Sequence, residues 1–327
     1  MGTSNNLVWI VYAVPDDVLG IHHVTAIAGD PQRNIEFYAR LLGLRLVKRT
    51  VNFDDPNTYH LYYGDEVGHP GTILTFFPWP NAPPGRLGTG QLTVTSFAIP
   101  ENSVQFWIDR LRQAKVEFSG PRDRFDETVL SFSDPEGLQL ELVATTKAEG
   151  DLTWKSGPVP GQHGIRGFFG VTLSEESLNG TQDLLLKLGF RQKTHQESRH
   201  RYEVGDGSAG KIVDVLHLPS LPRGQIAVGT VHHVAWRTPN DDEQKEWRSR
   251  LIDAGLNVTP VIDRQYFHSI YFRESGGVLF EIATDPPGFA VDELPAELGT
   301  NLMLPPWLES MRENIEQSLP PIQLPSN

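Results

Sequence analysis

An internal repeat constrains this chain more than any other feature of its sequence. When the sequence is shifted against itself by 140 positions, ten identical residues align without a gap between residues 94–141 and 234–281. They include Trp107 with Trp247 and Glu141 with Glu281. Self-similarity at a fixed spacing indicates that one structural unit has been duplicated.

Both copies predict the same order of elements, β-α-β-β-β. A short apolar strand comes before an amphipathic helix, and β-rich runs follow, the last of which carries the aligned glutamate. In the two copies the first strands are residues 92–99 and 231–237, the helices 101–114 and 241–254, and the last strands 137–143 and 277–283.

Two further units of this kind can be recognised at lower similarity. The first has a strand at 21–27, a helix at 31–42 and more strands up to residue 77. At an offset near 147 its Val24-Thr25 matches Val171-Thr172 in the other unit. Four modules, numbered one to four in chain order, therefore fill residues 20–290, and the predicted fold class is α+β.

Stretches rich in Pro and Gly divide the chain. The stretch at residues 157–164 is the stronger candidate for a boundary between halves. We expect an N-terminal pair of modules at 15–156 and a C-terminal pair at 157–290. A tail at 291–327 would carry a short helix at 307–317.

Composition excludes several classes of function. The chain has no cysteine, which rules out disulfides and thiolate metal sites, so any metal must be held by His and carboxylate side chains. A net charge of −13 opposes general binding to nucleic acid or anionic lipid. The longest apolar run, Leu7 to Val14, is too short to cross a bilayer and has no basic residue before it. We expect a soluble cytoplasmic protein.

Two His-His pairs occupy the first strands of modules one and four, and Glu281 lies in the last strand of module four. The pairs are His22-His23 and His232-His233. Because successive strand side chains point to opposite faces, one His of each pair can face a given cavity. Two imidazoles and one carboxylate match the facial triad of non-haem iron oxygenases. This site requires the first and last modules to be neighbours in space.

The other modules lack a complete set of ligands. At the positions aligned with the histidines, module two has Thr93 and module three has Gly170. We therefore expect Glu141 and Asp214 to be salt-bridged or solvated relics of the duplication. Single histidines, such as His60, are expected to serve packing.

Three more residues are candidates for supporting the site. Thr25 is two residues from His23 and therefore on the same strand face. Tyr271 lies ten residues before Glu281 on the expected neighbouring strand. Arg264 is the third candidate. For each of the three, a functional and a packing role remain open on sequence grounds.

With these residues in place, the chain resembles the vicinal-oxygen-chelate superfamily of glyoxalases, bleomycin-resistance proteins and extradiol dioxygenases. Within it, the chain is similar to the hydroquinone-type ring-cleaving dioxygenases. The similarity covers roughly residues 20–290. Its motifs are GIHHVT (20–25), LVKRTVNFDD (46–55), YHLYYGDEVGHPGT (59–72), VHHVAW (231–236) and SGGVLFE (275–281).

The resemblance implies modules paired into open half-barrel sheets around a metal cavity, with modules one and four together. It implies iron(II), or alternatively manganese(II), held by the second His of each pair and the glutamate, namely His23, His233 and Glu281. Five further positions would line or support the site: His22, His232, Thr25, Arg264 and Tyr271. The implied substrates are an aromatic para-diol and dioxygen, because module three lacks the His of the catechol-cleaving relatives.

Three alternatives stay open at this point. The same fold serves glyoxalase-like isomerases and thiol transferases, which use the metal as a Lewis acid but often have only two modules. A 2-oxo-acid dioxygenase of the superfamily would hold its ligands in the C-terminal half. A non-catalytic ligand-binding protein would bind no metal. Homo-oligomerisation is compatible with each of them.

Overall fold

The computed structural model describes residues 17–147 and 152–324 and contains all four β-α-β-β-β modules. The helices of the four modules follow their first strands, as expected. These helices are α1 (Pro31–Ile35) with the π-helical segment η1 (Glu36–Leu41), α2 (Val104–Gln113), α3 (Asn179–Lys187) and α4 (Asp241–Asp253). The α+β prediction is confirmed.

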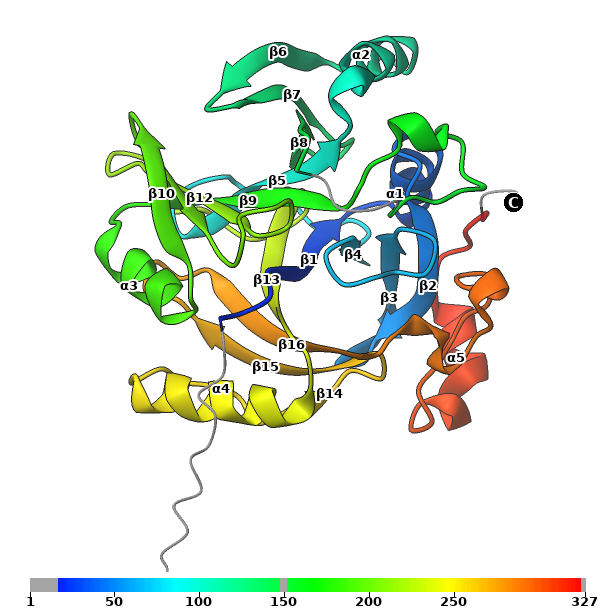
Figure 1. Cartoon of the computed structure of the whole chain (residues 1–327). Coiled ribbons are helices and arrows are strands. Elements are labelled where there is room, and N and C mark those ends of the chain that lie inside the picture. Colours follow the sequence, from blue (N-terminus) through cyan, green and yellow to red (C-terminus); the bar gives the residue numbers. More distant parts are fainter. Residues whose placement is uncertain (1–16, 148–151, 325–327) are drawn as a thin grey trace, which may run out of the picture.

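Modules one and four form the first of two eight-stranded sheets, as predicted. Their first strands, β1 and β13, lie side by side and antiparallel at its centre. The strand order is β14 (Ile262–Asp263), β15 (Phe267–Arg273), β16 (Leu279–Pro287), β13 (Thr230–Thr238), β1 (Ile21–Ala28), β4 (Ile73–Pro78), β3 (Asp55–Gly64) and β2 (Arg45–Asn52). The sheet curls into a half-barrel, with α4 packed on β13, β15 and β16 (Figure 1).

Modules two and three form the second sheet in the same way, with β5 and β9 antiparallel at its centre. Its order is β10 (Arg191–Gln196), β11 (Arg199–Glu203), β12 (Ile212–His217), β9 (Phe168–Glu175), β5 (Gln91–Ile99), β8 (Gln139–Ala144), β7 (Glu127–Ser133) and β6 (Phe118–Arg124). Each sheet thus takes strands from both predicted sequence halves. The division at residues 156 and 157 stays a prediction.

Helix α4 illustrates how local sequence defines an element. The Asn240 side chain accepts hydrogen bonds from the backbone N–H groups of Asp242 and Glu243, which caps the N-terminus. Acidic side chains in the first turn stabilise the helix, because its N-terminus is the positive end of the helix dipole. Trp247 and Leu251, four residues apart, are buried against the sheet. The helix therefore follows the predicted pattern closely.

The C-terminal tail runs along the first sheet. The Met303 N–H donates to the carbonyl of Arg49 in β2 at 2.9 Å. The predicted helix at 307–317 begins later than expected, as α5 (Arg312–Ser318), which contacts β3. The apolar run Leu7 to Val14 lies outside the described residues. Within residues 17–147 and 152–324, no helix is both long enough and apolar enough to span a membrane.

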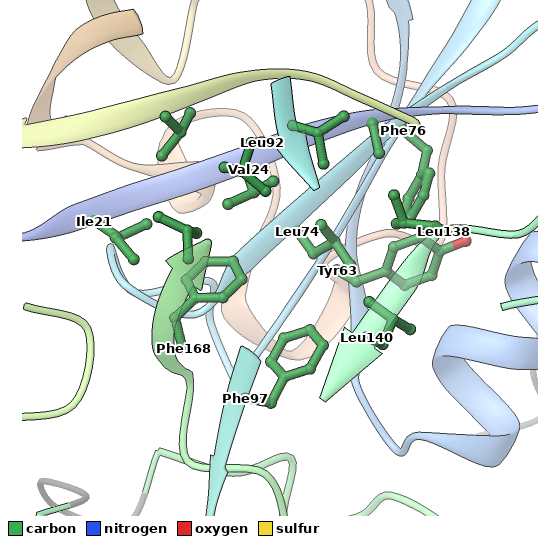
Figure 2. Close-up of a cluster of buried hydrophobic side chains, with 14 of the residues drawn as sticks. Ile21, Val24, Tyr63, Leu74, Phe76, Leu92, Phe97, Leu138, Leu140 and Phe168 are labelled. Atoms are coloured by element: carbon green, nitrogen blue, oxygen red, sulfur yellow. The ribbon is translucent and has the colours of Figure 1, made fainter. Parts of the chain in front are cut away.

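The hydrophobic core joins the two sheets. Val24 and Leu74 from the first sheet pack near Phe97 and Phe168 from the second, and all four are at most 1% exposed (Figure 2). The Phe97 and Phe168 rings stack with centroids 5.4 Å apart. Burial of each such side chain contributes about 1.5–3 kcal/mol. The two sheets therefore share one hydrophobic core.

Candidate metal centre

Three buried side chains converge on one point of the first sheet: His23, His233 and Glu281. The two Nε2 atoms lie 3.3 Å apart. The Glu281 Oε2 atom lies 3.3 Å from His23 Nε2 and 3.0 Å from His233 Nε2. Each residue is at most 5% exposed. In the part of the chain that the structure describes, no other three His, Asp or Glu residues bring ligand atoms this close.

Strand register brings these residues together. In the central antiparallel pair, His23 lies opposite Ala235 and His233 lies opposite Thr25. Strand β16 runs parallel to β13, with Glu281 beside Ala235. All three side chains are therefore on the same face of the sheet. The predicted proximity of the first and last modules is confirmed.

Two β-bulges shape the His-His pairs. The register skips one residue at His22 and, on the other strand, one residue at His232. A bulge bends the strand and re-aims the side chains beside it. As a result, His22 Nδ1 lies 2.9 Å from His23 Nδ1, and His232 Nδ1 lies 2.7 Å from His233 Nδ1. Each pair is joined through Nδ1, which leaves the Nε2 atoms of His23 and His233 directed at Glu281.

The donor set fits a divalent metal ion. Three donor atoms each about 2.1 Å from one ion lie roughly 3.0–3.4 Å apart, which matches the observed separations. Glu281 Oε1 accepts a hydrogen bond from Ser269, whereas Oε2 is buried and has no hydrogen-bond partner among the described residues. Burial raises the pKa of Glu281, but the two imidazoles outweigh it and hold the pKa well below its usual value. This ionised oxygen faces the two imidazole Nε2 atoms and has no other polar neighbour in the described chain to satisfy it, so a metal ion held by all three atoms suits the site.

Tyr271 and Arg264 lie beside these three residues. Tyr271 pairs with Glu281 in register, and its ring lies edge-on to that of His233, with centroids 5.7 Å apart. Arg264 Nε donates to Tyr271 Oη at 3.2 Å, while its Nη1 donates to Asp54 at 3.0 Å. Burial raises the pKa of Tyr271 above its usual value, so this phenol is neutral at pH 7.

The remaining predicted site residues differ in position. His232 lines the cavity beside His233, and burial lowers its pKa to about 3. His22 is only 1% exposed and does not line the cavity. Thr25 is also buried outside the cavity wall, where its hydroxyl accepts a hydrogen bond from Thr75 at 3.0 Å. The structure thus brings His232, Arg264 and Tyr271 to the cavity and leaves His22 and Thr25 behind it.

A cavity of about 340 Å³ opens in front of His23 and His233, with Glu281 buried behind them. Its wall is mainly aromatic, which suits a flat apolar ring. Besides the histidines His23, His60, His232 and His233, the aromatic side chains are Phe53, Tyr62, Phe77, Trp79, Phe267 and Tyr271.

Sequence reasoning missed two of these residues, His60 and Tyr62. Their spacing of two residues in a strand places them on one face, which was an available signal. His60, assigned to packing as a single histidine, lies at the cavity wall instead.

The corresponding region of the second sheet holds a buried ion network and not a ligand set. Arg124 contacts both Glu141 oxygens, at 2.8 and 2.9 Å. Arg201 forms two hydrogen bonds with Asp214, at 2.8 and 3.0 Å. The prediction that Glu141 and Asp214 are salt-bridged is correct.

The alignment of module two needs one correction. In the second sheet the bulge falls at Thr93, and Val94 lies opposite Thr172 as His233 lies opposite Thr25. The counterpart of His233 is therefore Val94, not Thr93. The ungapped offset hid this shift of one residue, because the last strands keep the offset of 140.

Comparisons with known proteins agree with this architecture. The family described as "Glyoxalase/Bleomycin resistance protein/Dioxygenase superfamily" matches residues 20–142 and 147–291. Over 306 residues, covering 94% of this chain and 97% of the relative, the chain is 48% identical to "Putative ring-cleaving dioxygenase MhqO" of Bacillus subtilis. It is 33% identical to "Chlorohydroquinone/hydroquinone 1,2-dioxygenase" of Sphingobium indicum, covering 94% of this chain and 97% of that enzyme.

A solved structure is also similar. The crystal structure of a "putative dioxygenase" from Bacillus subtilis superposes with a TM-score of 0.91 at 47% identity. The match covers 95% of this chain and all of that one.

Proposed function

The chain belongs to the Glyoxalase/Bleomycin resistance protein/Dioxygenase superfamily, and from this premise we propose that it is an iron(II)-dependent dioxygenase that opens the ring of hydroquinones. The observation that carries the proposal is the convergence of His23, His233 and Glu281, of which the two histidines line an aromatic cavity. Two imidazoles and a carboxylate with open positions suit ferrous iron, and manganese(II) is the alternative. The names of the relatives supply the substrate class.

Iron, when bound, supplies positive charge that favours an ionised substrate hydroxyl and an electron-transfer centre for dioxygen. The protein positions the substrate and supplies charged and hydrogen-bonding groups around it. Arg264 places a guanidinium beside Tyr271 and offsets negative charge that develops on the substrate. Tyr271 can donate its phenolic proton, because Arg264 already donates to its oxygen. When His233 holds a metal through Nε2, its Nδ1–H group donates to His232 Nδ1, so His232, which is neutral at pH 7, keeps its own proton on Nε2 and acts there as a hydrogen-bond donor.

The cavity wall also suits the proposed reaction. Aromatic side chains such as Phe77, Trp79 and Phe267 exclude water and hold a flat ring against the metal centre. A dry site strengthens the electrostatic effects of Arg264 and Glu281. Binding and chemistry therefore depend on the same wall.

The test is dioxygen uptake by protein loaded with iron(II) under nitrogen and then mixed with air-saturated hydroquinone, methylhydroquinone or chlorohydroquinone. Catechol is run alongside, and the ultraviolet spectrum of the product is recorded. We expect stoichiometric uptake with a ring-opened chromophore for the para-diols. The His23→Ala variant should lose it, and His195→Ala, which removes an exposed histidine of the second sheet, should retain it. No uptake by protein shown to hold iron would refute the proposal.

A further inference from the structure

Two tyrosines face the cavity from equivalent strands on the two sides of the central strand pair. Tyr271 in β15 lies beside Glu281 in β16, and Tyr62 in β3 lies beside Thr75 in β4. Strands β15 and β3 are each two strands away from the central β13–β1 pair. Tyr62 is therefore the module-one counterpart of Tyr271, and both line the cavity.

A chain of hydrogen bonds fixes the proton of Tyr62. The Thr75 hydroxyl donates to Thr25 at 3.0 Å, so Thr75 Oγ1 must accept the proton of His60 Nε2, which lies 2.8 Å away. Burial, with smaller effects of His23 and His233, lowers the pKa of His60 well below its usual value. A neutral imidazole that donates through Nε2 accepts through Nδ1. The Tyr62 hydroxyl, 2.8 Å from Nδ1, therefore donates to His60.

The two tyrosines consequently present opposite polarities to a ligand. The Tyr62 hydroxyl donates its hydrogen bond to His60, so only the lone pairs of its oxygen are left to interact with a ligand. Tyr271 accepts from Arg264 Nε and keeps a proton to donate. Stacking holds His60 in place, with ring centroids 4.0 Å from Tyr62 and 4.3 Å from Phe77.

We propose that Tyr62, oriented by His60, accepts a hydrogen bond from the second hydroxyl of the substrate and so selects rings with a free hydroxyl para to the one at the metal. The inference rests on the proposed function, since it assigns one end of the ring to the metal centre. Tyr62 is then a specificity-determining residue, and His60 is a positioning residue that acts through it.

The experiment measures dissociation constants by calorimetry under nitrogen, with manganese(II)-loaded protein and three phenols of similar shape. Hydroquinone has a distal donor, 4-methylphenol has a methyl group of similar size, and 4-methoxyphenol has only an acceptor. One hydrogen bond corresponds to roughly a 2- to 13-fold change in affinity. We expect wild-type protein to bind hydroquinone that much more tightly than either monophenol, and Tyr62→Phe to lose the preference over 4-methylphenol.

Variants of His60 test the positioning role separately. His60→Phe keeps the ring stack but frees the proton of Tyr62, so 4-methoxyphenol should gain affinity relative to 4-methylphenol. His60→Gln, which can accept from Tyr62 and donate to Thr75, should restore the wild-type ranking. If His60 only supported the fold, its substitution would weaken the binding of all three phenols equally.

The outcomes separate this inference from the proposed function. If hydroquinone and 4-methylphenol bind wild-type protein equally, or if Tyr62→Phe keeps the full preference, the inference is wrong while ring cleavage can still be observed. If no phenol binds metal-loaded protein and no dioxygen is consumed, the proposed function itself is wrong, and the inference fails with it. Retained folding of each variant is checked by its thermal transition.

Discussion

Replacing Arg201 with Met should strongly destabilise the protein, because its guanidinium bridges two buried carboxylates of the second sheet. Arg201 is 2% exposed. Its Nε and Nη2 donate to Asp214, and its Nη1 contacts Glu127 at 2.5 Å. Asp214 keeps a second partner, since Arg199 Nη1 lies 2.9 Å from Oδ2. Removing Arg201 therefore affects the ion pairing of Glu127 more than that of Asp214.

The size of the effect follows from this geometry. Breaking a buried ion pair by removing one partner costs about 3–5 kcal/mol. Burial, partly offset by Arg201, raises the pKa of Glu127 to about 7, so this carboxyl can take up a proton when Arg201 is removed. We therefore expect the loss of stability to lie at the lower end of this range, about 3 kcal/mol. For 327 residues the entropy of unfolding is roughly 0.7 kcal/mol/K, which converts this loss into a Tm decrease of about 4 °C.

The assay is thermal unfolding followed by circular dichroism at pH 7.5. Arg122→Met is the matched control, because its side chain is 53% exposed and reaches Glu141 only at 3.4 Å; its Tm should change by less than about 1 °C. The double variant Arg201→Met/Glu127→Leu should recover part of the loss, since it removes the stranded carboxylate. A decrease of less than about 1 °C for Arg201→Met, or a double variant that loses the sum of both effects, would refute the reasoning.

Three further predictions concern pH, metal and a helix cap. Burial and the nearby Glu274 raise the pKa of Glu175 to about 8, so its contribution to stability is complete below pH 4.5 and lost as pH rises towards 8. The Tm of Glu175→Gln relative to wild type should therefore increase between pH 5 and pH 9, whereas the exposed control Glu176→Gln should show no such trend. Iron at 100 times its dissociation constant should raise the wild-type Tm by about 4 °C, and His233→Ala should lose both this shift and the bound metal measured by mass spectrometry. Asn240→Ala removes the cap of α4 and should cost about 1 kcal/mol in urea unfolding; an unchanged midpoint would contradict the capping role.

The repeat made the architecture predictable, because equivalent modules must bury equivalent faces. Only modules one and four carry histidines in their first strands, so the sequence predicted their proximity and a site with one His of each pair and Glu281. The choice of His23 and His233 rested on the family resemblance. The alternation rule did not predict the bulges at His22 and His232, since a bulge depends on how two distant strands are paired.

Other details depend on contacts that a sequence pattern does not contain. The role of His60 could not be predicted from a single imidazole, because it depends on Tyr62 and Thr75 on either side. The shift from Thr93 to Val94 requires the strand register. Helix η1 widens to a π-helix within a segment whose apolar periodicity predicts an ordinary helix.

The pairing of the first and last modules determines when during biosynthesis the metal centre can exist. His23 and His233 are 210 residues apart in sequence. When the ribosome has made the first three modules, β1 still lacks its partner β13, so one edge of the first sheet is unpaired. Contacts at such long sequence separation also form slowly, because loop closure must come first. A nascent chain should therefore be unable to hold a metal ion at this site until its fourth module has emerged, which would make metal binding a late event in folding.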